Sequence, residues 1–204
     1  DMAVVNADGI RFYNEFAEPV EREVLTANWD QEAAEKGGYP HFMLKEMYEQ
    51  PKAILDTFSP RIKGNEVVID ELGMSDDEIR AVKKIMIVAC GSAYHAGVTG
   101  KYIFEGLTRI PVEVDTASEF RYRDPILVED SMVVIISQSG ETADSMAALR
   151  LARDRNVPVL SVVNVVGSSI ARESDYTLYT YAGPEISVAT TKAYSTQLIA
   201  GYCL

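Results

Sequence analysis

The chain has 204 residues, and 31 acidic against 19 basic side chains give it a formal net charge of −12 at pH 7. This acidity argues against nucleic-acid binding, which requires a basic surface. Hydrophobic residues make up 47% and charged residues 25%, the proportions of an ordinary globular protein. No apolar run approaches the roughly 20 residues that span a bilayer, and the N-terminus lacks the layout of a signal peptide. We therefore expect a cytoplasmic protein with no membrane partner.

Metal and disulfide chemistry are not expected. Cys90 and Cys203 each lie among apolar residues, which does not indicate a disulfide framework. His41 and His95 are the only histidines, so a zinc cluster is not expected either. We expect no metal and no cofactor.

Residues 1–38 are expected to form a tail and a linker. A strand-like start at Met2–Val5 precedes an acidic stretch that ends in Gly37-Gly38. At the other end, residues 197–204 form an apolar, helical-looking stretch without a capping or breaking signal. We expect a piece of a longer polypeptide, and a buried C-terminal helix is the alternative.

Residues 39–83 are expected to form a helical lead-in. Apolar residues recur at helical spacing over 41–58, and Pro51 is expected to divide this stretch into two short helices. Ser75 then offers an N-cap, followed by three acids, for a helix that continues over 79–83.

From residue 84 onward, short apolar runs alternate with amphipathic helices, which is typical of βαβ units. We expect strands at 85–89, 112–114, 132–136, 159–163 and 176–179, and helices at 94–107, 142–155, 168–173 and 188–204. This pattern predicts an α/β fold with a five-stranded parallel sheet and helices on both faces. Such sheets bind ligands beyond the carboxyl ends of their strands.

Two strand ends carry candidate anion cradles. Cys90-Gly91-Ser92-Ala93 follows the first strand of this sheet, and Ser137-Gln138-Ser139-Gly140-Glu141-Thr142 follows the third. Each leads into a helix, whose free N–H groups and positive dipole end attract a phosphate. The alternative is an ordinary N-cap made by Ser139 and Thr142. The helix behind it would then bury a stripe of four residues: Ala143, Met146, Ala147 and Leu151.

Other phosphate-binding motifs are missing. The chain has neither GxGxxG after the first of these strands nor GxxxxGK[ST], so a sugar phosphate fits better than a nucleotide. After the last strand, residues 182–192 bring a carboxylate and several hydroxyls to the same edge. Glu185 could be a general base, a hydroxyl acceptor or a cap, and Lys192 is equally ambiguous.

Five segments together resemble the glutamine:fructose-6-phosphate amidotransferases, also called glucosamine-6-phosphate synthases. They are residues 39–51 (YPHFMLKEMYEQP), 90–94 (CGSAY), 117–123 (ASEFRYR), 137–144 (SQSGETAD) and 185–192 (EISVATTK). The resemblance implies a glutaminase domain followed by two sugar isomerase (SIS) domains, of which this chain is the first SIS domain. It also implies a flavodoxin-like, three-layer sandwich over 84–204, a helical lead-in at 39–83, and the glutaminase tail and linker at 1–38.

The resemblance also implies roles for single residues. Phosphate ligands are expected at Gly91, Ser92, Ser137, Gln138, Ser139 and Thr142, and the sugar is expected beside Cys90, Val188 and Thr190, with Glu185 as a further binding residue. Ala93 departs from the family, many of whose members have serine there. The ligands would be fructose 6-phosphate and glucosamine 6-phosphate, in a homodimer. The family's catalytic residues lie in its glutaminase and second SIS domains, so we expect no catalytic residue and no turnover in this chain alone.

Two other interpretations stay open. SIS-like domains also serve regulators that only sense a sugar phosphate, and such a protein would carry a DNA-binding domain beside the SIS domain. A flavodoxin-type nucleotide binder is a more distant alternative. The tail-like residues 1–38 and the absence of a basic patch favour the synthase.

Overall fold

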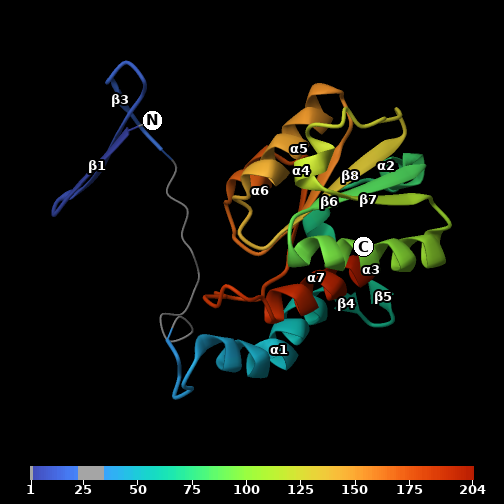
Figure 1. Ribbon diagram of the computed structural model, residues 1–204, viewed down its shortest axis with the longest axis horizontal. Helices are drawn as coiled ribbons and strands as arrows, with labels where there is room; N and C mark the ends of the chain where they lie inside the picture. Colours follow the sequence, from blue (N-terminus) through green and yellow to red (C-terminus); the bar gives the residue numbers. More distant parts are fainter. Residues whose placement is uncertain (1, 23–34) are drawn as a thin grey trace.

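The computed structural model describes residues 2–22 and 35–204, and its centre is a five-stranded parallel sheet (Figure 1). The strand order is β10-β9-β8-β6-β7. The strands are β6 (Lys84–Ala89), β7 (Val112–Thr116), β8 (Ser131–Ser137), β9 (Val159–Val163) and β10 (Tyr176–Tyr179). All five strands expected in this region are confirmed, with bounds that differ by at most two residues.

Helices cover both faces of this sheet, which makes the predicted three-layer sandwich. On one face α3 (Ser92–Thr108) and α7 (Lys192–Cys203) pack over a core that includes Ile87, Val134 and Leu178. On the other face lie α4 (Ala117–Phe120), α5 (Ala143–Asp154) and α6 (Ser169–Glu173). This double coverage explains the near-continuous apolar sequences of β6, β8 and β9, since both faces of these central strands are buried.

The strand order reverses between β6 and β8. From β6 the chain crosses to β7 at one edge, and it then returns to β8 on the other side of β6. This is the flavodoxin-like order, and it opens a crevice at the carboxyl ends of β6 and β8. Both predicted cradles follow these two strands.

The lead-in contains one long helix where two were expected. Helix α1 (Phe42–Phe58) runs through Pro51 without a break. Proline has no N–H to donate to the carbonyl of Met47 one turn earlier. The side-chain amide of Gln50 donates to that carbonyl instead, at 3.1 Å, which replaces the missing bond. Helix α1 also packs along α7, so tertiary contacts support it.

Short elements join α1 to the sheet. They are η2 (Ser59–Arg61), the hairpin of β4 (Ile62–Lys63) and β5 (Glu66–Val67), η3 (Asp70–Leu72), and α2 (Asp76–Ala81). Ser75 caps α2 as predicted, but the helix ends at Ala81 and does not reach residue 83.

The expected tail contains more structure than a single strand. The predicted strand β1 (Met2–Asn6) pairs with β2 (Gly9–Tyr13), and β2 pairs with β3 (Pro19–Val20). Residue 1 and residues 23–34, which belong to the same expected tail and linker, lie outside the described residues.

Two helix predictions need correction. Helix α5 buries Ser145, Met146, Ala148, Leu149 and Ala152, so of the expected stripe only Met146 is fully buried. Alanine and leucine occur on two faces of this helix, and the pattern alone did not distinguish them. Helix α7 begins at Lys192 and not at 188, because the residues before it form a loop. Among the described residues no helix is long and apolar enough to cross a membrane.

Candidate functional site

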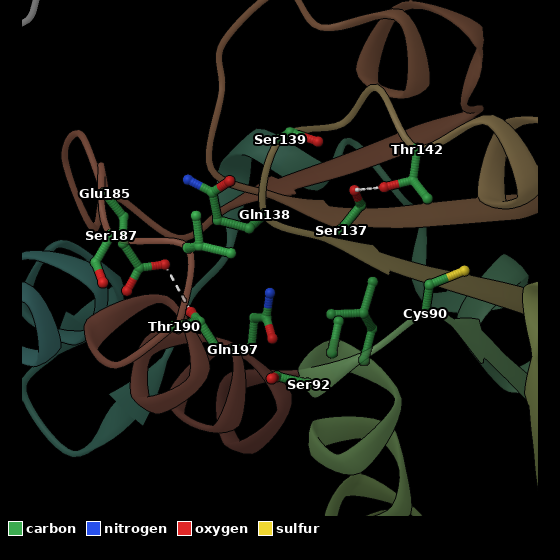
Figure 2. A pocket seen from close by; sticks show the side chains of 13 residues that line it. Cys90, Ser92, Ser137, Gln138, Ser139, Thr142, Glu185, Ser187, Thr190 and Gln197 are labelled. Carbon is green, nitrogen blue, oxygen red and sulfur yellow. Dashed lines mark hydrogen bonds between the residues drawn. The ribbon is translucent and has the colours of Figure 1, made fainter. Parts of the chain in front are cut away.

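A cavity of about 230 Å³ lies at the carboxyl ends of β6 and β8, where the strand order reverses (Figure 2). Segments from three parts of the chain line it: the β6–α3 turn, the β8–α5 loop, and the loop before α7 with part of α7 itself. The lining residues are Cys90, Ser92, Ala93, Ile136, Ser137, Gln138, Ser139, Thr142, Glu185, Ser187, Val188, Thr190 and Gln197.

Nine of the ten predicted binding residues line this cavity. The tenth, Gly91, is not a lining residue; it is the N-cap of α3, at φ 57°. A positive φ is costly for residues with a side chain, so glycine permits the turn that brings α3 to the cavity. Gly91 therefore shapes the site through the backbone.

The β8–α5 loop is held by its own hydroxyl groups. The Ser137 hydroxyl accepts a hydrogen bond from the Gly140 amide at 3.1 Å, and the Ser139 hydroxyl accepts one from the Glu141 amide at 3.2 Å. The hydroxyl oxygens of Ser137 and Thr142 lie 3.4 Å apart. In the two contacts with backbone amides the serine oxygens act as acceptors, so their O–H groups remain able to donate to an anion in the cavity. Between Ser137 and Thr142 either hydroxyl can be the donor.

Two helix N-termini without side-chain caps meet at this cavity. No side chain caps α3 or α5, although Thr142 stands at the N-cap position of α5. The alternative in which Ser139 and Thr142 serve only as caps therefore lacks its defining hydrogen bond. Amide groups of a helical first turn have no partner within the helix, and the dipole adds positive potential. The lining residues include no lysine or arginine, so these amides, the hydroxyls and the side-chain amides of Gln138 and Gln197 are the groups that can attract an anion.

Glu141 does not face an anion from this loop. Its carboxylate accepts a hydrogen bond from the Ser169 amide at 2.7 Å, at the start of α6. This contact joins the β8–α5 loop to the start of α6.

Glu185 has the contacts of a cap. Its carboxylate accepts hydrogen bonds from the Thr190 hydroxyl at 2.6 Å, the Thr191 amide at 2.8 Å and the Ala193 amide at 3.2 Å. Among its three possible roles, these contacts favour a structural one, which fixes the loop and the first turn of α7. Lys192 is buried and forms an ion pair with Glu49 at 2.7 Å, which accounts for its charge.

Four lining residues were not among the predicted binding residues: Ala93, Ile136, Ser187 and Gln197. Gln197 is 5% exposed and reaches the cavity from α7. The sequence offered no clear signal for it, because Lys192 and Thr196 are further buried polar residues of the same helix. At Ala93 the side chain borders the cavity without a hydroxyl, as the sequence implied.

Comparison with known proteins gives a consistent result. The chain matches the SIS domain family over residues 78–204. It is 56% identical over its whole length to the glutamine–fructose-6-phosphate aminotransferase (isomerizing) of Clostridium acetobutylicum, and 53% identical to that of Clostridium tetani. It spans about a third (34%) of the length of each of these relatives.

Among solved structures, the C-terminal domain of glucosamine-fructose-6-phosphate aminotransferase from Francisella tularensis is similar, with 45% sequence identity and a TM-score of 0.78. The similarity covers 83% of this chain and 47% of that one. The family match, the relatives and the parallel sheet agree, and the chain belongs to the SIS domain family.

Proposed function

We propose that this chain binds a sugar phosphate in the cavity at β6 and β8, with the phosphate on the β8–α5 loop. One observation supports this proposal most directly. Two uncapped helix N-termini meet at one cavity, which is also lined by the hydroxyls of Ser137, Ser139 and Thr142. A phosphate monoester is small enough for this cradle, and its charge is matched by helix dipoles and N–H groups. Among the remaining lining residues, Glu185, Ser187 and Thr190 supply polar groups beside which the sugar would lie.

We further propose that the sugar phosphate is fructose 6-phosphate and that its product is glucosamine 6-phosphate. The full-length protein would make glucosamine 6-phosphate and glutamate from fructose 6-phosphate and glutamine. This chain would supply substrate binding as the first SIS domain, and the glutaminase and second SIS domains would supply the chemistry. High identity to the aminotransferases of two Clostridium species supports the proposal.

The proposal includes an arrangement of domains and subunits. Residues 1–38 would be the glutaminase tail and linker, 39–83 the helical lead-in and 84–204 the SIS core. We expect a cytoplasmic homodimer.

The test is an activity assay of the full-length protein that carries this chain. Thr142→Val keeps the shape of the side chain and removes its hydroxyl, and Ser139→Ala removes another. A hydrogen bond to a charged group contributes about 1.5–3 kcal/mol, so the KM for fructose 6-phosphate should rise about tenfold or more in each variant.

The matched control is Thr108→Val, at the far end of α3, where the hydroxyl bonds only to nearby backbone. Its KM should equal that of the wild type. A wild-type protein that makes no glucosamine 6-phosphate, or hydroxyl variants with an unchanged KM, would refute the proposed function.

A further inference from the structure

The wall of the cavity formed by residues 183–191 is held at its ends by residues of the SIS core and in its middle by a residue from outside it. Its lining residues Glu185, Ser187, Val188 and Thr190 lie between β10 and α7 with no regular secondary structure. Such a segment keeps one conformation only if other groups satisfy its backbone. Its two ends are held within the core: Asn164 binds Ala182 N–H and the Gly183 carbonyl, and Glu185 binds the turn into α7.

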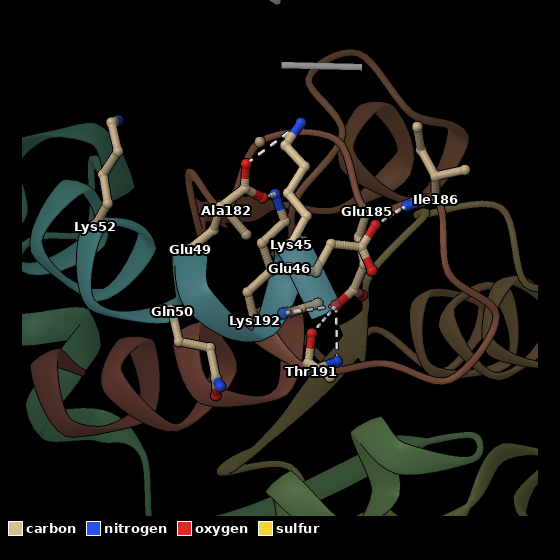
Figure 3. A network of polar contacts seen from close by, with 12 residues as sticks. Lys45, Glu46, Glu49, Gln50, Lys52, Ala182, Glu185, Ile186, Thr191 and Lys192 are labelled. Atoms are coloured by element: carbon tan, nitrogen blue, oxygen red, sulfur yellow. Dashed lines mark hydrogen bonds and ion pairs between the residues drawn. The ribbon is translucent and has the colours of Figure 1, made fainter. Parts of the chain in front are cut away.

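The middle of this wall is held by Glu46, on α1 (Figure 3). One carboxylate oxygen, Oε1, accepts hydrogen bonds from the amides of Ile186 at 2.6 Å and Ser187 at 3.1 Å. Bonds from backbone amides to an ionised carboxylate are stronger than neutral ones. Residues 140 positions apart in the chain are thereby joined at the cavity.

Helix α1 is itself fixed to α7, so the position of Glu46 relative to α7 is fixed as well. The Lys192 ammonium lies 2.7 Å from the Glu49 carboxylate, and the Ser195 hydroxyl donates to the Gln50 side chain at 2.6 Å. These contacts lie one turn along α1 from Glu46. The polar residues of α1 therefore have two roles. Glu49 and Gln50 bind α7, and Glu46 binds the loop that precedes α7.

Packing alone does not account for Glu46. The side chain is 2% exposed, and its second oxygen, Oε2, has no hydrogen-bond partner among the described residues. A buried acceptor without a donor costs about 1–3 kcal/mol, and an apolar side chain of similar size would avoid that cost. The two hydrogen bonds that the carboxylate accepts from consecutive amides of the cavity wall compensate this cost.

We propose that Glu46 is a positioning residue that sets the sugar-facing wall of the cavity, so that helix α1 forms part of the sugar site although it lies outside the matched SIS region. This rests on the proposed function. The phosphate cradle is built on β6, β8 and their helices and does not depend on Glu46. Loss of Glu46 should therefore weaken binding of the sugar portion and leave binding of phosphate alone unchanged.

The experiment compares fructose 6-phosphate with inorganic phosphate as probes, titrated by NMR into three forms of this chain. Glu46→Met keeps the volume and removes both acceptors, and we expect fructose 6-phosphate to bind about tenfold more weakly. Glu46→Gln keeps one neutral acceptor, and its affinity should lie between that of Glu46→Met and that of the wild type. The dissociation constant of inorganic phosphate should stay within about twofold in all three.

Hydrogen exchange supplies a readout that needs no ligand. The amides of Ile186 and Ser187 should exchange faster in Glu46→Gln, and faster still in Glu46→Met, than in the wild type. The control is Asp56→Ala, also on α1, whose partner is the exposed Lys52. It should change neither affinity nor exchange.

The outcomes separate the two proposals. Wild-type chain that binds fructose 6-phosphate, with Glu46 variants equal to it in affinity and exchange, would overturn the positioning role alone. An equal loss of inorganic phosphate binding would overturn it too, because the role would then be general stability. Wild-type chain that binds no fructose 6-phosphate would overturn the proposed function and, with it, this inference. If Glu46→Met does not fold, Glu46→Gln decides by the same criteria.

Discussion

The conformation and surroundings of Gly140, in the β8–α5 loop, leave no room for a side chain at this position. Its φ is +66°, which favours glycine, and a Cβ placed there would lie 2.1 Å from the Ser168 hydroxyl oxygen and 2.5 Å from the Ser168 Cβ. Ser168 is buried, so it has little room to move. The loop can approach α6 this closely only because residue 140 has no side chain.

We therefore predict that Gly140→Ala lowers the free energy of unfolding by about 2–4 kcal/mol, the sum of a steric overlap and an unfavourable φ. Urea denaturation measures this. The matched control is Gly106→Ala, within α3, where a Cβ would meet nothing within 4 Å. Alanine is the better helix former, so the control should gain about 0.5–1 kcal/mol. Equal stability of Gly140→Ala and the wild type would contradict the close approach.

At the scale of elements, the capping box of α2 links the lead-in to the sheet. Ser75 and Glu78 bind each other's backbone amides, and Glu78 also accepts a hydrogen bond from the Tyr176 hydroxyl at 2.8 Å, at β10. Hydrogen bonds from the Ser75 side chain and amide, then from Tyr176, lower the pKa of Glu78 from 4.5 to about 2. The ionised carboxylate is thus favoured in the folded state.

A lowered folded-state pKa adds stability above the unfolded value, near 4.5, and this contribution disappears as pH falls through about 2. We predict that Glu78→Gln is less stable than the wild type at pH 7, and that the difference shrinks steadily between pH 4.5 and pH 2. Denaturant unfolding across this range tests the prediction. Asp77→Asn, with a fully exposed side chain on the same helix, should show a smaller effect at pH 7. A difference in unfolding free energy between Glu78→Gln and the wild type that grows as the pH falls would contradict the prediction.

The sequence was sufficient to predict the central strands and the candidate anion cradles, but not the contacts between distant segments. Strands β6, β8 and β9 are buried on both faces and have nearly continuous apolar sequences, so they and the residues that follow them were predicted. The continuity of α1 through Pro51 depends on a hydrogen bond from the Gln50 side chain, and helix propensities of single residues do not include such a contact. Glu46 and Gln197 were missed because their roles arise from contacts between distant segments.

At the scale of the whole molecule, the cavity joins segments that are far apart in the chain. Its lining comes from the ends of β6 and β8 and from α7 with its preceding loop. A ligand in the cavity would contact all of them and bind only the folded chain. Its binding energy would then add to the stability of the fold.

We predict that fructose 6-phosphate at about 100 times its dissociation constant stabilises the chain by about 2.7 kcal/mol. For a chain of this size that corresponds to a rise in Tm of about 5–10 °C. Fructose, which lacks the phosphate, is the matched control and should leave Tm unchanged at the same concentration. An equal rise with fructose would show that the phosphate cradle is not the principal binding element.

The most direct measurement is titration calorimetry of this chain with fructose 6-phosphate and glucosamine 6-phosphate, in the wild type and in the triple variant Ser137→Ala, Ser139→Ala, Thr142→Ala. Three lost hydrogen bonds to a charged group should weaken binding at least 100-fold, while Thr108→Val should bind as the wild type does. Triple-variant affinity equal to that of the wild type, or a wild-type chain that binds neither sugar phosphate, would contradict the assignment of the β8–α5 loop as the phosphate cradle.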